Sequence, residues 1–282
     1  MASVRHQDVV DELRAAGCVF AEDEARILLE APDTDVAALL ARRVGGEPLE
    51  HVVGWVAFAG ARLSVAPGVF VPRRRTELLA RVAAEATHDG AVVVELCCGI
   101  GAVAHVVATR RRPARVVAVD LDPAATACAR VNLPQAEVLT GDLVAPLPAD
   151  LRRAVDVLVA NAPYVPTAAV ETMPREARDH EPRIALDGGD DGLDIARRIV
   201  SEAGAWLAFG GVLAIETSSG QAPSLTTAMT AVGLHADVVT DDDLGGVVTV
   251  GRAPREQNRE LPSLTVGTAR PRPGADTEAS TT

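Results

Sequence analysis

A short polar loop, Asn161-Ala162-Pro163-Tyr164, directly follows an apolar run at residues 155–160. The run predicts a buried strand, so the loop would lie at the carboxyl end of a strand, where open α/β sheets bind their ligands. The Asn161 side chain offers a carbonyl acceptor, and the backbone carbonyl of Ala162 offers a second. Two acceptors aimed at one NH2 group would orient a planar amide or amino nitrogen for attack on an electrophilic methyl group.

Such a nitrogen is a weak nucleophile because its lone pair is delocalised. Paired acceptors stabilise the charge that develops on nitrogen, and alignment with the methyl group lowers the barrier by roughly 7 kcal/mol or more. The ring of Tyr164 could pack against the flat substrate group. We therefore predict that Asn161, Ala162, Pro163 and Tyr164 are catalytic and that no metal is required. Asn and Pro also form ordinary turns, so the loop must be judged with its surroundings.

A second motif is the glycine turn at residues 95–102, Glu-Leu-Cys-Cys-Gly-Ile-Gly-Ala. Gly99 and Gly101 would let the backbone approach a ligand closely. Asp120 ends the next predicted strand, where its carboxylate can accept hydrogen bonds from both ribose hydroxyls of an adenosine. Asp142 follows the third strand and could bind the adenine amino group. The turn also fits the G-x-G-x-x-A pattern of NAD-binding proteins or a tight turn without a ligand, but the Asn161 loop favours methyl transfer.

The elements that must position these motifs alternate between strand and helix from residue 76 onward. This order is typical of a mainly parallel sheet with helices on both faces. Strands are predicted at 91–96, 115–120, 137–140, 155–160, 212–216, 235–240 and 246–252, and helices at 77–87, 102–111, 123–131, 193–208 and 222–232. The fold class is therefore α/β, a seven-stranded, mostly parallel sheet that ends in an antiparallel hairpin, an arrangement similar to the Rossmann-like sheet of many methyltransferases.

Four regions are predicted along the chain. Helical spacing at 3–16, 21–31 and 33–44 indicates a small helical domain over residues 1–48. Residues 49–75 form a linker, with two strands within 52–66 around Ala59-Gly60. The methyltransferase domain spans 76–252. Residues 253–282 are rich in Pro, Arg, Glu, Thr and Ser and are predicted to be a disordered tail.

The composition indicates which class of partner and which cellular compartment to expect. The chain carries 39 acidic and 27 basic residues, a net charge of −12, whereas proteins that grip a phosphate backbone usually carry a basic face. A protein substrate is therefore favoured over nucleic acid. The four cysteines have no zinc-site spacing, and neither a signal segment nor a membrane span is evident. We expect a cytoplasmic protein without membrane contact.

Taken together, the motifs resemble the HemK/PrmC-type protein N5-glutamine methyltransferases, which modify the glutamine of the GGQ motif in peptide-chain release factors. The resemblance covers about residues 46–252. Its matching segments are Gly46-Glu47-Pro48-Leu49, Phe70-Val71-Pro72-Arg73 with Thr76-Glu77, the glycine turn, the Asn161 loop, and the stretch at 180–193 that begins His-Glu-Pro-Arg.

The resemblance implies S-adenosyl-L-methionine as the cofactor and a release factor as the protein partner, recognised by the helical N-terminal region. It implies cofactor contacts from Glu95, Cys97, Gly99, Gly101, Asp120, Asp142 and Asn161. It implies substrate contacts from Pro72, Arg73, Thr76, Glu77, Asn161 and Tyr164. Glu216, at the end of a late strand, aligns with an acidic position of the family.

Three departures from the family pattern leave alternatives open. Ala162 stands where the family has the first proline of NPPY, and Cys97 stands where it has a glycine, which a small side chain tolerates if φ is negative. Arg74-Arg75 replace Pro-Asp, and the basic turn at residues 73–75 would either be solvated or contact an acidic or phosphate-bearing partner. The alternatives are a methyltransferase for an exocyclic amino group of a nucleic-acid base and a noncatalytic paralogue that binds the cofactor.

Overall fold

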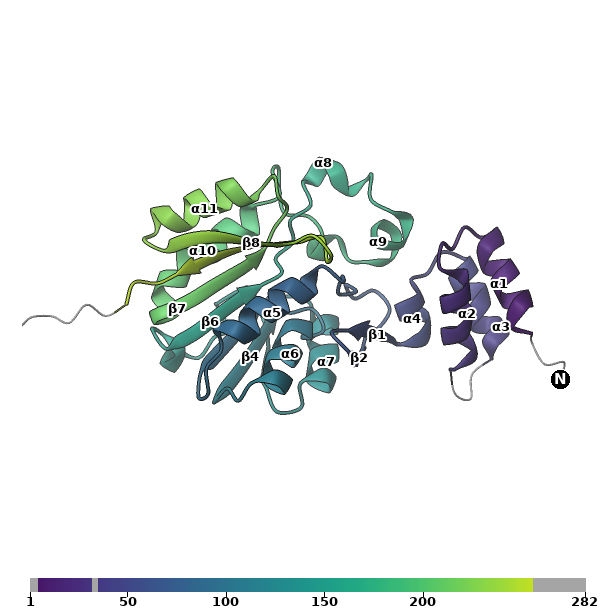
Figure 1. Ribbon diagram of the computed structural model, residues 1–282, viewed down its shortest axis with the longest axis horizontal. Helices are drawn as coiled ribbons and strands as arrows, with labels where there is room; N and C mark the ends of the chain where they lie inside the picture. The colour runs from purple at the N-terminus through teal and green to yellow at the C-terminus, as the bar shows by residue number, and fades with distance from the viewer. Residues whose placement is uncertain (1–4, 32–34, 256–282) are drawn as a thin grey trace, which may run out of the picture.

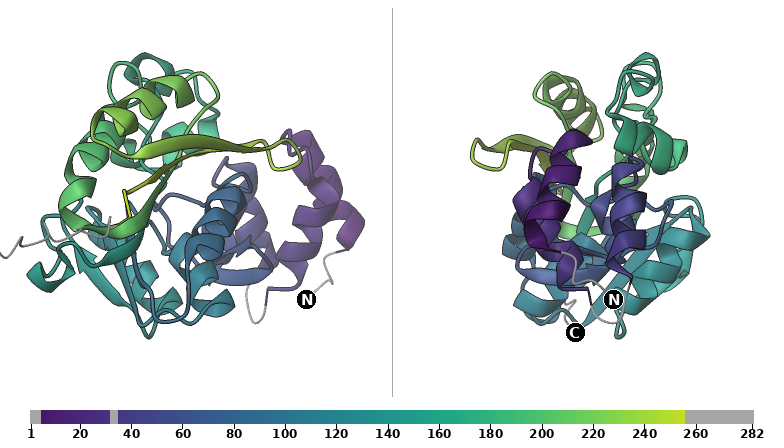
Figure 2. Two further views of the ribbon diagram at one scale, coloured as in Figure 1. Left: turned by 60° about the vertical axis from the view of Figure 1, so that its left-hand side comes forward. Right: turned by 90° about the vertical axis from the view of Figure 1, so that its right-hand side faces the viewer.

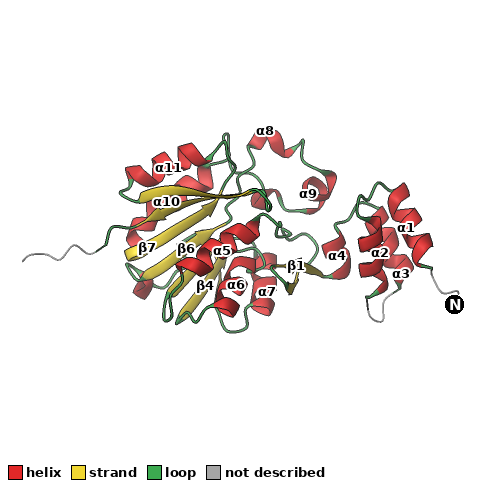
Figure 3. Cartoon of the chain, viewed as in Figure 1, coloured by secondary structure: helices red, strands yellow, loops and turns green. Residues whose placement is uncertain are grey.

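The computed structural model describes residues 5–31 and 35–255 of the chain. Its centre is a seven-stranded sheet of order β5-β4-β3-β6-β7-β9-β8, flanked by helices (Figures 1 and 3). The strands of this sheet are β3 (Val92–Leu96), β4 (Arg115–Asp120), β5 (Glu137–Thr140), β6 (Val155–Ala160), β7 (Leu207–Glu216), β8 (His235–Asp241) and β9 (Gly246–Arg252). The predicted fold class is confirmed. From residue 256 on, the predicted tail lies outside the described residues.

The strand order places the two chemical motifs side by side. Strands β5, β4, β3, β6 and β7 pair in parallel, and β9 joins β7 antiparallel. The chain runs outward from β3 to β4 and β5, then returns to add β6 on the other side of β3. Ligands bind at such a reversal point, outside the carboxyl ends of the strands. The glycine turn after β3 and the Asn161 loop after β6 both begin there.

Alternating side chains bury the two faces of the sheet against different helices. Val93 and Val157 face a core shared with α5 and α6, whereas Val94 and Leu158 face a core shared with α10 and α11. The helices of this region are α5 (Thr76–Ala86), α6 (Ala102–Arg110), α7 (Pro123–Asn132), α8 (Thr167–Val170), α9 (Arg175–His180), α10 (Asp194–Trp206) and α11 (Ala222–Ala231).

The N-terminal helices form a separate group at one end of the molecule (Figures 1 and 2). Helices α1 (His6–Ala15), α2 (Ala21–Leu29) and α3 (Val36–Val44) share their own core. A short helix, α4 (Leu49–Val53), and the hairpin of β1 (Trp55–Phe58) and β2 (Ala61–Ser64) connect this group to the sheet region. The boundaries of the predicted domains stay predictions.

Two predicted elements differ from the structure. The strand expected from residue 52 begins only at Trp55, because Val52 packs into the N-terminal core as part of α4 and Gly54 ends that helix at φ +78°. The helix expected to reach residue 208 ends at Trp206, and β7 starts at Leu207 rather than at 212. The apolar run there satisfies helical and strand spacing equally. The short helices α8 and α9 were not predicted.

Candidate active site

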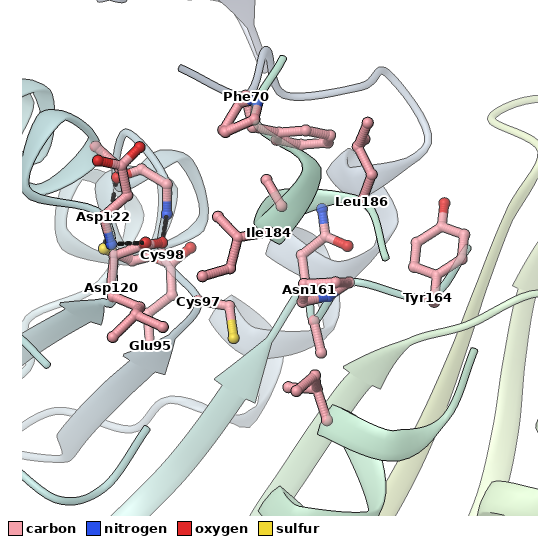
Figure 4. Close-up of a pocket in the computed structure, with 18 of the residues that line it drawn as sticks. Phe70, Glu95, Cys97, Cys98, Asp120, Asp122, Asn161, Tyr164, Ile184 and Leu186 are labelled. Atoms are coloured by element: carbon pink, nitrogen blue, oxygen red, sulfur yellow. Dashed lines mark hydrogen bonds between the residues drawn. The ribbon is translucent and has the colours of Figure 1, made fainter. Parts of the chain in front are cut away.

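One pocket lies at the carboxyl ends of β3, β4 and β6 (Figure 4). It gathers residues that are far apart in the sequence, and most of the predicted site residues line it. These are Pro72, Arg73, Thr76, Glu95, Cys97, Gly99, Asp120, Asp142, Asn161, Ala162, Pro163 and Tyr164. Gly101 and Glu77 do not line it.

Asp120 is held at the end of β4 by two backbone donors. Its Oδ2 accepts a hydrogen bond from the Gly99 amide at 2.7 Å, and its Oδ1 accepts one from the Asp122 amide at 2.9 Å. Burial raises the pKa of this carboxyl, and the two amides oppose that rise. Each carboxylate oxygen retains a second lone pair. The group is therefore oriented beside the glycine turn and can still accept from the hydroxyls of a ribose.

Glu95 lies beneath the same turn and is almost fully buried. Its Oε2 accepts a hydrogen bond from the Ala104 amide at 2.7 Å, in the first turn of α6. Burial raises the pKa of Glu95 to about 8. This carboxyl satisfies a free N–H at the start of the helix and lines the pocket, where a cationic group of a ligand would favour its charged form.

The backbone of the glycine turn is left-handed at three positions. Cys97 has φ +51°, so the condition under which a small side chain would be tolerated there, a negative φ, is not met. Its thiol lines the pocket, and burial raises its pKa, so the thiol stays protonated. Gly99 has φ +53°, and open space surrounds the position of a Cβ atom.

Gly101 has a packing role and does not line the pocket, and its predicted cofactor contact stays a prediction. It precedes α6 at φ +78°, and a Cβ atom there would lie 2.5 Å from Leu133 Cδ1. Glu77 likewise faces away from the pocket toward the β1–β2 hairpin. Its Oε1 accepts a hydrogen bond from the Ala59 amide at 3.2 Å. Its predicted contact with substrate stays a prediction.

Asp142 lies on the far wall of the pocket, after β5. Its carboxylate pairs with Arg198 of α10 at 2.7 Å, and Leu121, Leu143 and Ile195 add apolar surface to the pocket. An apolar slot with an acceptor at its rim fits a flat base with an amino group. Sequence reasoning missed Arg198 because it lies 56 positions beyond Asp142 in the chain.

The Asn161 loop closes the other end of the pocket. Figure 4 shows Asn161 between Cys97 on one side and the ring of Tyr164 on the other. Asn161 Nδ2 donates a hydrogen bond to Thr76 Oγ1 at 3.4 Å. Among the residues that the structure describes, none donates a hydrogen bond to Asn161 Oδ1 or to the Ala162 carbonyl. Both predicted acceptors are thus free for a ligand.

A buried carboxylate forms a hydrogen bond with Tyr164 of this loop. Glu216, at the end of β7, is 2 % exposed. Its Oε1 accepts from the Tyr164 hydroxyl at 3.3 Å and from Arg75 Nε at 3.2 Å, and the Arg75 guanidinium also covers the Tyr164 ring, 5.6 Å from its centroid. Burial raises the pKa of Tyr164 to about 12. The phenol therefore stays protonated and acts as a donor.

The basic turn at residues 73–75 is largely paired within the chain. Arg73 binds the buried carboxylate of Glu181 at 2.6 Å, and Arg75 binds Glu216. Both arginines also line the pocket. These two side chains therefore form ion pairs within the chain, and neither is simply solvated. The apolar residues Phe70, Ile184 and Leu186, which line the same pocket, were not predicted.

Within residues 5–31 and 35–255, no cluster of three or more His, Cys, Asp or Glu side chains could hold a metal ion. No helix in the same residues is long and apolar enough to cross a membrane.

Comparison with known sequences identifies the family. The sequence model described as the methyltransferase small domain matches residues 61–180. A release factor glutamine methyltransferase of Mycolicibacterium smegmatis is 40% identical over 83% of this chain and 86% of its own length. The enzymes of the same name from Streptomyces coelicolor and Geobacter sulfurreducens are 39% and 37% identical, over 70% and 74% of this chain and 74% of each relative.

Solved structures agree with the fold. A methyltransferase of Pyrococcus furiosus matches 70% of this chain and 90% of its own, with a TM-score of 0.53 and 14% identity. A Thermus thermophilus 16S rRNA methyltransferase in complex with AdoMet and guanosine matches 71% of this chain and 49% of its own, with a TM-score of 0.52 and 21% identity. The sequence relatives carry the further step: this chain belongs to the release factor glutamine methyltransferase family and is an S-adenosylmethionine-dependent methyltransferase.

Proposed function

We propose that this chain methylates the side-chain amide nitrogen (N5) of a glutamine in a peptide-chain release factor, and that Asn161 and Ala162 hold that amide. S-adenosylmethionine supplies an electrophilic methyl group when bound. The observation that carries the proposal is the pair of free acceptors, Asn161 Oδ1 and the Ala162 carbonyl, in the same pocket as Asp120 and Gly99.

Each residue of the pocket would have its own contact with the cofactor or the substrate. Asp120 accepts from the ribose hydroxyls, Gly99 allows close approach, Glu95 lies near the methionine end, and Asp142 accepts from the adenine amino group. The two acceptors of the Asn161 loop take the two N–H groups of the glutamine amide. This contact aims the nitrogen lone pair and stabilises the charge that develops on nitrogen.

The wall near residues 70–76 would bind the rest of the substrate. Pro72 and Phe70 offer apolar surface in the pocket that Tyr164 also lines, and the Tyr164 ring would pack on the flat amide. Because the Arg73 guanidinium is paired with Glu181, Arg73 would bind substrate only through N–H groups that this pair leaves free. The paired arginines and the net charge of −12 favour a protein substrate over nucleic acid, and such a substrate favours a cytoplasmic location.

The test is methyl transfer from labelled S-adenosylmethionine to purified release factors from the same source, beside copies with the GGQ glutamine replaced. Label should appear on the intact factors alone. Asn161→Ala should lower turnover at least 100-fold, in the range of losses for a transition-state hydrogen bond, while the Kd for S-adenosylmethionine changes less than threefold.

Two results would count against the proposal. Label on the glutamine-replaced factors would place the methyl group elsewhere. No label on any factor, with cofactor binding intact, would favour the base-methylating or noncatalytic alternative, and labelling of nucleic acid would separate those two.

A further inference from the structure

The nitrogen end of the Asn161 amide is held by a residue of α5. Its Nδ2 donates to Thr76 Oγ1 at 3.4 Å. Thr76 begins α5 and is 2 % exposed. An asparagine amide can turn by half a rotation, which exchanges its oxygen and its nitrogen with little change in shape. An acceptor placed against one end of the amide therefore decides which amide atom is left free for a ligand.

Thr76 can act as that acceptor only if its own proton points elsewhere, because a hydroxyl that donates to Asn161 would favour the reversed amide. The neighbouring carboxylate of Glu216 supplies the reason. Glu216 Oε2 is buried and has no hydrogen-bond partner among the described residues. The Thr76 hydroxyl lies close enough to oppose the rise in the pKa of Glu216 that burial causes.

Glu216 is in turn held in place by two other neighbours, which also oppose the rise in its pKa that burial causes. Arg75 Nε lies 3.2 Å from its Oε1, and the Tyr164 hydroxyl donates to the same oxygen at 3.3 Å. A charged carboxylate is a pure acceptor. Its unpartnered Oε2 is therefore open to the Thr76 proton, and a hydroxyl turned toward it leaves only a lone pair of Oγ1 for Asn161.

From this chain of contacts we infer that Thr76 and Glu216 are positioning residues that fix the Asn161 amide with Oδ1 toward the pocket. The site thereby prefers a substrate group that donates N–H over one that presents a carbonyl. The inference rests on the proposed function for its catalytic consequence, but the orientation of the amide can be measured without turnover.

The first test is kinetic. Thr76→Val keeps the shape and removes the hydroxyl, and we expect kcat to fall about tenfold, the effect of roughly one hydrogen bond. Thr76→Ser should restore kcat to within threefold. The matched control is Thr109→Val on α6, where the lost hydroxyl bonds only to backbone carbonyls of its own helix. This control should leave kcat unchanged, and no variant should alter the Kd for S-adenosylmethionine more than twofold.

Glu216 is tested through its dependence on Thr76. Glu216→Gln alone should lower kcat at least threefold, and it should add less than twofold in a protein that already carries Thr76→Val, since both act through one amide. Losses that multiply in the double variant would overturn the role of Glu216.

The second test observes the amide itself. The sequence has three asparagines, at positions 132, 161 and 258, so side-chain 15N labelling of asparagine gives three NH2 signals. Asn161→Asp identifies the one of interest. Thr76→Val should shift the Asn161 signal, Thr76→Ser should restore it, and Thr109→Val should leave it in place.

The two readouts separate failure of this inference from failure of the proposed function. Wild-type methylation of the release factor with no loss of kcat in Thr76→Val would overturn the inference, as would an Asn161 signal that does not respond to Thr76→Val. An absence of glutamine methylation in the wild type, with the predicted shift of the Asn161 signal, would overturn the proposed function and support the orientation of the amide.

Discussion

Asp120→Asn separates the structural role of this side chain from its role in cofactor binding. In the structure both carboxylate oxygens accept backbone hydrogen bonds, from Gly99 at 2.7 Å and from Asp122 at 2.9 Å. An asparagine supplies one oxygen and one NH2 group, so one of these backbone donors would face another donor. An unsatisfied buried donor costs about 1–3 kcal/mol. Because burial raises the pKa of Asp120, removal of its charge offsets part of that cost, and we expect about 1 kcal/mol of lost stability.

The effect on cofactor affinity should be larger. A hydrogen bond to a charged group contributes about 1.5–3 kcal/mol, and the variant keeps one oxygen for one ribose hydroxyl. The loss of the other bond should raise the Kd for S-adenosylmethionine about 10- to 100-fold, at about 1.4 kcal/mol for each factor of ten. Calorimetry gives the Kd, and urea unfolding of the ligand-free protein gives the stability.

Asp35→Asn is the matched control for this change. Asp35 caps α3, far from the pocket, by accepting from the Ala37 amide at 3.1 Å, and asparagine caps helices as well as aspartate does. Both measurements should stay near the wild-type values. A folded Asp120→Asn protein whose Kd rises less than threefold would refute the assignment of the ribose to Asp120.

Three further changes test other parts of the structure by chemical denaturation. Gly101→Ala should cost about 2–5 kcal/mol, the sum of the costs of a left-handed φ and of an overpacked contact. Gly60→Ala should show the φ cost alone because nothing lies within 4 Å of its Cβ position, so equal losses in the two variants would contradict the packing role of Gly101. Burial raises the pKa of Glu95 from 4.5 to about 8, so the folded protein retains this proton and the free energy of unfolding should fall as pH rises through that range. Glu95→Gln should flatten this dependence of stability on pH. A dependence that Glu95→Gln leaves unchanged would contradict the raised pKa of Glu95. Arg43→Met should cost about 3–5 kcal/mol because it leaves the buried Glu24 unpaired, and a loss below 1 kcal/mol would show that this pair is unimportant.

The alternation of strand and helix could be predicted from the sequence because each sheet face is buried, which fixes the spacing of apolar residues. The glycine turn and the Asn161 loop could be placed for the same reason, since each directly follows a clear strand. The predicted boundaries of elements were wrong where helical and strand spacing fitted the apolar residues equally, as at Leu207, where β7 begins. They also failed at Val52, whose burial depends on a core made by other helices.

The supporting contacts of the site could not be predicted because they join distant parts of the chain. Glu216 lies 141 positions from Arg75, and Glu181 lies 108 positions from Arg73. The triplet at 73–75 has the composition of a solvated basic turn, and only the fold brings buried carboxylates to two of its members. The left-handed φ of Cys97 was missed since it depends on how β3 leaves the sheet, and residue type gave no sign of it.

The parallel pairing of β3 with β6 has a consequence for how the protein folds. Val93 pairs with Val157, 64 positions later, and this pairing brings the two halves of the pocket together. Closing so long a loop is slow, and topologies rich in such distant contacts fold slowly. The cofactor can bind only after that step, so it should slow unfolding without speeding refolding. The bound cofactor would thus stabilise the sheet kinetically, after its strands have paired.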